Sequence, residues 1–155
     1  MRSYLAHSSH EQKQGKEIEA RLTGMGIDVY NPFDKENEKY AELHAIIKNE
    51  GGFKLTDEEI GDRMTPEFAT WIVDVDLEEI RKSDIVIYII PEPEFHSVGG
   101  VCEMFWASRI LNMPVFAYAP PHLVHHPWII DHCEVICATL EDLYSFLEWF
   151  MGESE

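Results

Sequence analysis

The chain has 155 residues, 45% of them hydrophobic, and its 12 basic and 29 acidic residues leave a formal net charge of −17. This length and apolar content are typical of one folded domain with its own core and exclude a disordered segment. A surface this acidic repels polymeric nucleic acid and anionic membranes, and no apolar run approaches the roughly 20 residues that span a bilayer. We therefore expect a single domain over residues 1–155 that binds neither nucleic acid polymers nor membranes.

The cysteines and the N-terminus indicate the compartment. The three cysteines are an odd number without the spacing of a disulfide framework. The first residues, Met1-Arg-Ser-Tyr-Leu5, lead directly into a strand-like run and lack the apolar region of a signal peptide. Both features predict a reduced, cytoplasmic protein.

Short apolar runs alternate with helical patterns along the chain. Strands are predicted at residues 3–7, 27–30, 84–90, 114–118 and 134–137. Helices are predicted at residues 11–25, 72–80 and 98–112, and a final helix capped by Thr139 extends to about residue 150. The run Asn31-Pro-Phe-Asp34 is predicted to be a turn that ends the second strand. Apolar strands separated by helices are typical of parallel sheets that are covered on both faces. The predicted fold is α/β: a doubly wound, Rossmann- or flavodoxin-like sheet of five parallel strands.

One connection is unusually long for such a fold. Residues 35–70 contain helix-like pieces at 38–49 and 56–63, broken by Gly51-Gly52 and by Pro66. Long connections at the functional edge of a sheet are often lids or oligomer contacts. The sequence does not decide between these two roles for the insert.

A carboxylate follows the glycine turn after the third predicted strand. The run Ser97-Val-Gly-Gly-Val-Cys-Glu103 places Glu103 within the first two turns of a helix, near the edge where open α/β sheets bind ligands. A helix N-terminus favours the ionised carboxylate, which is the form that a nucleophile needs. On local pattern alone, Glu103 is either a nucleophile or an ordinary first-turn glutamate.

The first turn carries two hydroxyls and two imidazoles, in His7-Ser8-Ser9-His10. Ser8 or Ser9 suits an N-cap of the following helix. The functional alternative is that these groups, with the helix-start N–H groups, hold a sugar hydroxyl or a phosphate.

Several familiar motifs are missing. The chain has no GxxxxGK[ST], no GxGxxG after the first strand and no GxSxG, which argues against a triphosphatase, an ordinary dinucleotide-binding dehydrogenase and a serine hydrolase. The histidines and cysteines fit no closed zinc spacing, and His122 to His126 read as a solvated loop between prolines. We expect no metal and no cofactor.

Taken in order, the motifs resemble the nucleoside 2-deoxyribosyltransferase family and its nucleoside 5′-monophosphate N-glycosidase branch. The resemblance rests on Tyr4-Leu-Ala6, on Asp76-Leu-x-x-Ile80-x-x-x-Asp84-Ile-Val, and on Ser97-x-Gly99-x-x-x-Glu103. Ala107 and Pro114-Val115 follow at the expected distance, so the match spans residues 4–118, with the insert as its least comparable stretch.

Two positions depart from the usual pattern of the family. Phe105 stands where the family has glycine, which makes the helix bulkier and puts the shape of the pocket in doubt. Ser97 stands where the deoxyribosyltransferases carry an aspartate, and the monophosphate glycosidases resemble this chain in having a serine there. An aspartate at this position would repel a phosphate.

The resemblance implies roles for named residues. Glu103 would attack the anomeric carbon, Asp76 would help to protonate the leaving base, and Tyr4 would orient Glu103. Ser8 and Ser97 would contact a 5′-phosphate, and Gly99 and His7 would line the substrate site. Members of the family assemble as dimers or larger oligomers, so His125 is a candidate for a residue lent across the interface.

Three functions stay open from the sequence. The first is hydrolysis of the N-glycosidic bond of a (deoxy)nucleoside 5′-monophosphate through a covalent glycosyl-enzyme intermediate. The second is base exchange on 2′-deoxynucleosides, which the absence of arginine in residues 3–20 favours. The third is a nucleotide-binding sensor without turnover, in which Phe105 would fill the pocket. The base, the sugar and the exact oligomeric state are not predicted.

Overall fold

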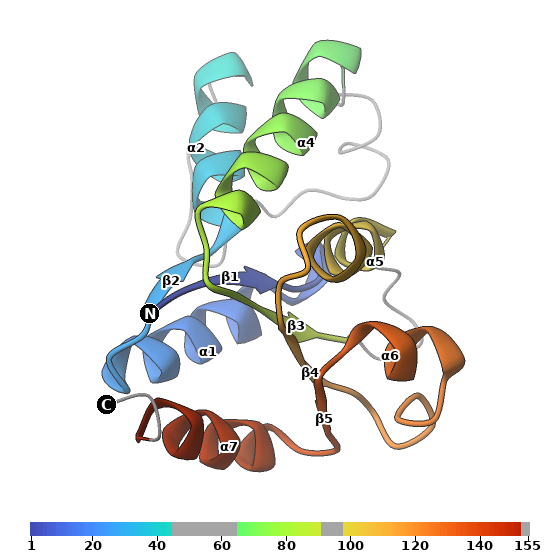
Figure 1. The fold of residues 1–155 in the computed structure, drawn as a ribbon. Coiled ribbons are helices and arrows are strands. Elements are labelled where there is room, and N and C mark those ends of the chain that lie inside the picture. Colours follow the sequence, from blue (N-terminus) through green and yellow to red (C-terminus); the bar gives the residue numbers. More distant parts are fainter. Residues whose placement is uncertain (45–64, 91–97, 153–155) are drawn as a thin grey trace.

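The protein is a single parallel sheet between layers of helices. The computed structural model describes residues 1–44, 65–90 and 98–152. The strands are β1 (Arg2–Ala6), β2 (Asp28–Tyr30), β3 (Ile85–Ile89), β4 (Val115–Tyr118) and β5 (Val135–Cys137), in the order β2-β1-β3-β4-β5. All four pairings are parallel, which confirms the predicted five-stranded α/β sheet (Figure 1).

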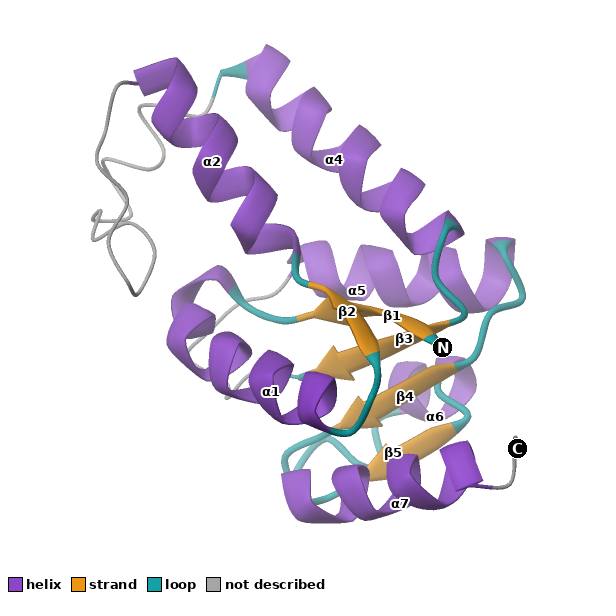
Figure 2. Cartoon of the chain, turned by 90° about the vertical axis from the view of Figure 1, so that its left-hand side faces the viewer, coloured by secondary structure: helices purple, strands orange, loops and turns teal. Residues whose placement is uncertain are grey.

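Helices cover both faces of this sheet (Figure 2). On one face lie α1 (Gln12–Gly24) and α7 (Leu140–Gly152), and on the other lie α4 (Pro66–Arg81), α5 (Val98–Phe105) and α6 (Pro127–His132). The helix α2 (Pro32–His44) follows β2 and rises beside α4 above the edge of the sheet (Figure 1).

Alternating side chains of the strands divide the core into two parts. In β3, Ile85, Ile87 and Ile89 pack with Leu22 of α1 and Leu147 of α7. The intervening residues of β3, Val86 and Tyr88, pack on the opposite face with side chains of α4, α5 and α6. All five β3 residues are buried, as expected for a central strand of a parallel sheet covered on both faces.

Two predicted elements differ from the structure. The run from Asn31 to Asp34, expected to be a turn, instead opens α2 at Pro32, because proline is pre-organised for the first helical position. The helix expected over 98–112 is α-helical only to Phe105 and continues as a π-helical segment, η2 (Trp106–Ile110). Asn112, with φ of 52°, then turns the chain toward β4. The predicted helix at 56–63 lies outside the described residues.

The start of α1 also differs from the N-cap alternative. A short 3₁₀ segment, η1 (Ser9–Glu11), precedes α1, and Glu11 occupies the cap position without a side-chain capping bond. By contrast, Thr139 caps α7 as predicted, because its Oγ1 accepts a hydrogen bond of 3.1 Å from the Asp142 N–H.

The topology marks where a ligand is expected. The chain leaves β1 toward β2 on one side and returns to β3 on the other, so the strand order reverses between β1 and β3. Crevices at the carboxyl ends of strands beside such a reversal are the usual ligand sites of open α/β folds. None of the described helices has both the length and the hydropathy required to cross a bilayer.

Candidate active site

Tyr4 and Glu103 meet where the strand order reverses. Tyr4 is fully buried in the middle of β1, and Glu103 is partly buried in the second turn of α5, which follows β3. The Tyr4 hydroxyl donates a hydrogen bond of 2.9 Å to Oε1 of Glu103. The two residues that the resemblance paired as orienting group and nucleophile are therefore in contact.

Asp76 is the second carboxyl group of the site. It lies on α4, is only 8% exposed, and is much less accessible than its helix neighbour Asp74. Burial raises the pKa of Asp76 from 3.8 to about 7, and the neighbouring Tyr4 hydroxyl opposes this rise. A carboxyl group that keeps its proton near neutral pH suits a general acid.

Glu103 differs from its expected electrostatic state. The position near the start of α5 predicts an ionised carboxylate, yet burial, and then repulsion from Asp76, raise the pKa of Glu103 from 4.5 to about 8. The Tyr4 hydrogen bond opposes the rise. Desolvation penalises the charge more than the helix terminus and the hydroxyl favour it.

A third carboxyl group, Glu36, was not identified from the sequence. It lies one turn after Pro32 on α2, and burial, followed by repulsion from Asp76 and Glu103, raises the pKa of Glu36 to about 8. We call Glu36, Asp76 and Glu103 the acidic site. A carboxylate just past the carboxyl end of β2 could have indicated Glu36, but residues 35–70 read as an insert.

Tyr30 closes the acidic site beside Tyr4. The two rings stack with centroids 5.7 Å apart and planes at 22°. The Tyr30 hydroxyl is buried and makes no hydrogen bond to a described residue. Burial and the charge of Asp76 raise the pKa of Tyr30, so the hydroxyl stays protonated and can donate to a ligand.

His7 and Ser8 follow β1 but are buried. His7 is 5% exposed and Ser8 is 2% exposed. The His7 ring nitrogens lie 3.1 Å from Asn31 Oδ1 and 3.2 Å from the Ser8 carbonyl oxygen. Substrate contacts by these two residues remain predictions.

Gly99 lies beside Glu103. It is exposed near the start of α5, and a Cβ at this position would lie 3.9 Å from Glu103 Oε1. A ligand can therefore approach the α5 backbone close to the carboxylate. Ser97 lies outside the described residues.

His125 and Phe105 belong to a different surface. His125 lines an open cleft of about 690 Å³ with Trp128 and His132 of α6. Phe105 is 42% exposed, and its ring centroid lies 5.7 Å from that of His132. The Phe105 side chain thus packs toward α6 and does not fill the space around Glu103.

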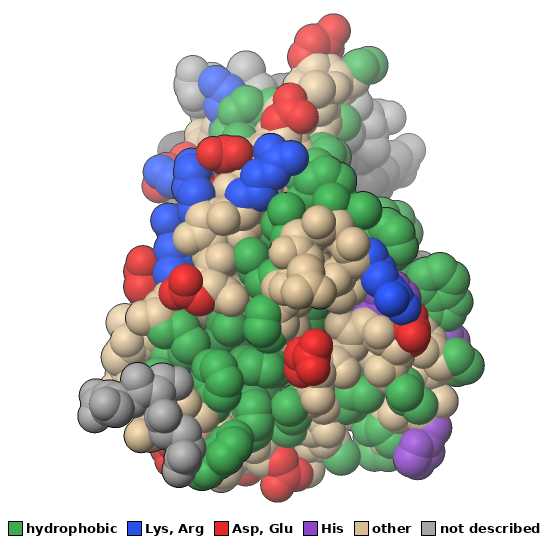
Figure 3. Space-filling model, in the orientation of Figure 1, with side chains coloured by type: hydrophobic (Ala, Val, Ile, Leu, Met, Phe, Trp, Pro, Cys, Tyr) green, Lys and Arg blue, Asp and Glu red, His purple; other side chains and the backbone are tan. Residues whose placement is uncertain are grey.

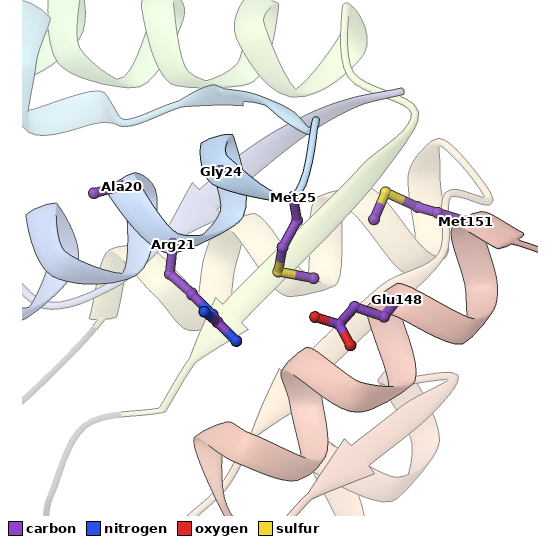
Figure 4. A pocket seen from close by; sticks show the side chains of 6 residues that line it. All are labelled: Ala20, Arg21, Gly24, Met25, Glu148 and Met151. Carbon is purple, nitrogen blue, oxygen red and sulfur yellow. The ribbon is translucent and has the colours of Figure 1, made fainter.

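A separate cleft of about 440 Å³ lies between α1 and α7 (Figure 4). Arg21, Met25, Glu148 and Met151 point into it from the two helices. Because α1 and α7 cover the face of the sheet opposite α5, this cleft is not part of the acidic site. In the described part of the chain, no three His, Cys, Asp or Glu side chains are arranged to hold a metal ion.

Comparison with known proteins identifies the fold. Neither a protein-family model nor a curated protein sequence matches the chain. Among solved structures, a 2-deoxyribosyltransferase from Bacillus psychrosaccharolyticus is similar over 93% of this chain and 90% of its own, with 21% identity and a TM-score of 0.65. The CMP N-glycosidase BcmB from Clostridium botulinum is similar over 97% and 99%, with 18% identity and a TM-score of 0.55. The chain therefore has the fold of a 2-deoxyribosyltransferase and of a CMP N-glycosidase.

Proposed function

We propose that this chain is an enzyme that cleaves the N-glycosidic bond of a (deoxy)nucleoside 5′-monophosphate, with Glu103 as nucleophile. The observation that carries the proposal is the hydrogen bond from Tyr4 to Glu103 beside a second, buried carboxyl group, Asp76. Glycosyl transfer with a covalent intermediate needs this pair: a carboxylate that attacks and a carboxylic acid that protonates the leaving group.

The first step forms a glycosyl ester. An oxygen of ionised Glu103 bonds to the anomeric carbon while the carbon–nitrogen bond breaks and its electron pair stays on the base. The carboxyl proton of Asp76 moves to the base as it leaves. The transition state resembles an oxocarbenium ion, whose positive charge the acidic site stabilises.

The raised pKa values provide the mixed protonation that this step needs. Three neighbouring carboxyl groups lose their protons one after another, because each new charge opposes the next. Near neutral pH some carboxyl groups of the acidic site are therefore ionised and others are protonated. The positive charge that develops on the sugar in the transition state favours the arrangement in which Glu103 carries the negative charge.

The second step releases the sugar. Asp76, now ionised, takes a proton from water, whose oxygen attacks the anomeric carbon and expels Glu103. Two displacements at the same carbon give retention of configuration.

The phosphate site is proposed at the start of α5. Backbone N–H groups at a helix start bind anions, and Gly99 leaves the approach to that backbone open beside Glu103. The hydroxyls of Ser97 and Ser8 are the side-chain donors proposed to join them.

Base exchange on 2′-deoxynucleosides is the second candidate. In the described part of the chain, the charges that act on Glu36 and Glu103 come from carboxylates, and no cation contributes. Arg2 lies beside the Tyr30 ring, 6.0 Å from its centroid, and does not act on these two carboxyl groups. Such an arrangement suits an uncharged nucleoside better than a phosphate.

A sensor without turnover is less well supported by the geometry. A sensor of this kind would have Phe105 in the pocket, but the Phe105 ring lies against His132 instead. Binding of a nucleotide with Glu103→Ala as tight as with the wild type, together with no turnover by the wild type, would favour the sensor.

A homo-oligomer is proposed from the surface over α5 and α6. Large apolar side chains are exposed there, namely Phe105, Ile110, Trp128 and Ile130. Figure 3 shows hydrophobic side chains on that side, interspersed with basic, acidic and histidine side chains. Apolar patches of this kind are typical of interaction surfaces. His125 on the same surface is the proposed residue lent to a partner's site.

The three free cysteines fit the proposed cytoplasmic location.

Chromatography of base release tests the proposal. Nucleosides and their 5′-monophosphates are each incubated with and without a free acceptor base. Release from monophosphates without acceptor supports hydrolysis, whereas a new nucleoside that forms only with acceptor supports exchange.

Glu103→Gln should abolish either activity, with Glu148→Gln on α7 as the control. Ser97→Asp should lower monophosphate use more than nucleoside use; equal effects would remove Ser97 from the phosphate site.

A further inference from the structure

The start of α2 is attached to β1 and α1 through a buried polar pair, His7 and Asn31. Asn31 is 4% exposed, and its Oδ1 lies 3.1 Å from His7 Nε2. The same oxygen accepts a hydrogen bond of 3.2 Å from the Phe33 N–H, in the first turn of α2. The Phe33 ring packs edge-on against the His7 ring, with centroids 4.7 Å apart.

The amide of Asn31 can have only one orientation here. Its Nδ2 donates a hydrogen bond of 2.9 Å to Oε2 of Glu19 on α1, while its Oδ1 accepts from Phe33. A flipped amide would lose both bonds. Asn31 therefore links three segments: the end of β1 through His7, α1 through Glu19, and α2 through its own backbone.

The His7 ring is held from both sides. Its two nitrogens face acceptors, Asn31 Oδ1 and the Ser8 carbonyl oxygen, so a neutral ring donates to one of them and a protonated ring to both. A Cβ at Gly15 of α1 would overlap the ring. Glycine in a helix interior is unfavourable, so Gly15 is explained by the close approach of α1 to His7.

Glu36 lies on the helix that this attachment holds. It lies one helical turn after Pro32, and each residue of a helix turns its side chain by about 100°. A shift of α2 by one residue would therefore turn Glu36 away from Asp76 and Glu103. Asn37 Nδ2, bonded at 2.9 Å to Gln12 Oε1, and the ion pair of Lys16 with Asp34 join α2 to α1, but the His7–Asn31 pair is the most deeply buried link.

We propose that His7 and Asn31 are positioning residues that hold Glu36 in the acidic site. Neither residue needs to touch the substrate for this role. The consequence for turnover rests on the proposed function, whereas the placement of Glu36 does not.

A carboxyl ¹³C NMR titration of the whole chain tests the placement, with the Glu36 signal assigned through Glu36→Gln. In the wild type the Glu36 signal should titrate well above the ordinary carboxyl range, because burial beside Asp76 and Glu103 raises the pKa of Glu36 to about 8. His7→Ala and Gly15→Ala should each lower this value by about one unit or more, toward the ordinary carboxyl range. Gly15→Ala removes no polar group, so it perturbs the pair only by displacing the ring.

Two further variants separate positioning from loss of stability. Thr139→Ala removes the cap of α7, which lies on the face of the sheet opposite α4 and α5, and should leave the Glu36 titration unchanged. His7→Gln restores a donor that can reach Asn31 and should restore the wild-type titration, which also covers the case in which His7→Ala does not fold. Wild-type titration of Glu36 in a folded Gly15→Ala or His7→Ala variant would overturn the proposal.

Turnover provides the second readout. The variants that lower the pKa of Glu36 should also lower kcat, and His7→Gln should recover it. If the wild-type chain turns over none of the nucleosides or nucleotides, the proposed function fails, and the Glu36 titration still decides whether the pair positions α2.

Discussion

The Tyr4 hydroxyl donates its hydrogen bond to Oε1 of Glu103 at 2.9 Å, across 99 positions of the chain. The bond joins the middle of β1 to the second turn of α5, so it forms only when β3 pairs with β1 and α5 packs on the sheet. It also opposes the effect of burial on the pKa of Glu103. Tyr4 therefore both orients the carboxylate and favours its ionised form.

Replacement of Tyr4 by phenylalanine isolates this hydroxyl. The ring of Tyr4→Phe can still stack on Tyr30, so the chain should fold. Without the hydrogen bond, the pKa of Glu103 should rise further. At pH 7 kcat should fall by roughly 10–100-fold, which corresponds to an increase of about 1.4–2.7 kcal/mol in the activation free energy. Turnover measured from pH 6 to 9 should show the acid side of the profile displaced to higher pH. An unchanged profile would mean that the hydroxyl does not act on Glu103.

Asp76→Asn tests the proposed general acid. Loss of the proton donor should lower kcat on the order of 10²–10⁴-fold for substrates whose base must be protonated to leave. A 7-methylpurine nucleotide carries a positive charge and leaves without protonation, so its cleavage should be affected much less. Asp74→Asn, an exposed neighbour on α4, is the matched control and should behave as the wild type. Equal losses for both substrates would assign Asp76 to binding.

The acidic site predicts a bell-shaped dependence of kcat/KM on pH. Activity requires one ionised carboxylate and one protonated carboxyl group together. The pKa values of about 7 for Asp76 and about 8 for Glu36 and Glu103 place the maximum between pH 7 and 8. Below this range all three groups are protonated and no nucleophile remains, while above it no acid remains. A profile flat from pH 5 to 9 would contradict shared protonation of the site.

Stability should depend on pH through the same groups. The pKa of Glu103 is about 8 in the folded chain against an ordinary 4.5, so the unfolded chain loses its proton first. The stabilisation is full below pH 4.5 and is lost as the pH rises through 8. The Glu103→Gln variant has no ionisable group at this position. At pH 8.5 the free energy of unfolding of this variant should exceed that of the wild type by on the order of 2–4 kcal/mol.

Chemical denaturation at pH 5.5 and 8.5 measures this difference. The advantage of Glu103→Gln should shrink at pH 5.5, where wild-type Glu103 retains its proton when folded. Glu148→Gln, an exposed glutamate on α7, should show no such dependence. A Glu103→Gln variant that is less stable than the wild type at pH 8.5 would mean that the buried charge is fully compensated.

The strands and the main pair of site residues were predictable from the sequence. A central parallel strand is buried on both faces, so Ile85-Val-Ile-Tyr-Ile89 must be apolar throughout and is recognisable without a structure. Thr139 was predicted as a cap because capping is decided within one turn of a helix. The position of Glu103 just past the carboxyl end of β3 follows from the order of strands and helices, whereas its pairing with Tyr4 was implied by the family resemblance.

Only the tertiary structure decided the electrostatics and the shape of the site. Glu36 joins Asp76 and Glu103 because α2 begins at Pro32 and is attached through Asn31, which a local pattern does not reveal. Phe105 packs toward His132 because the direction of a side chain depends on the helix packed beside it. The raised pKa of Glu103 has the same origin: burial and neighbouring charge are properties of the assembled layers, and they outweigh the local helix terminus that the sequence shows.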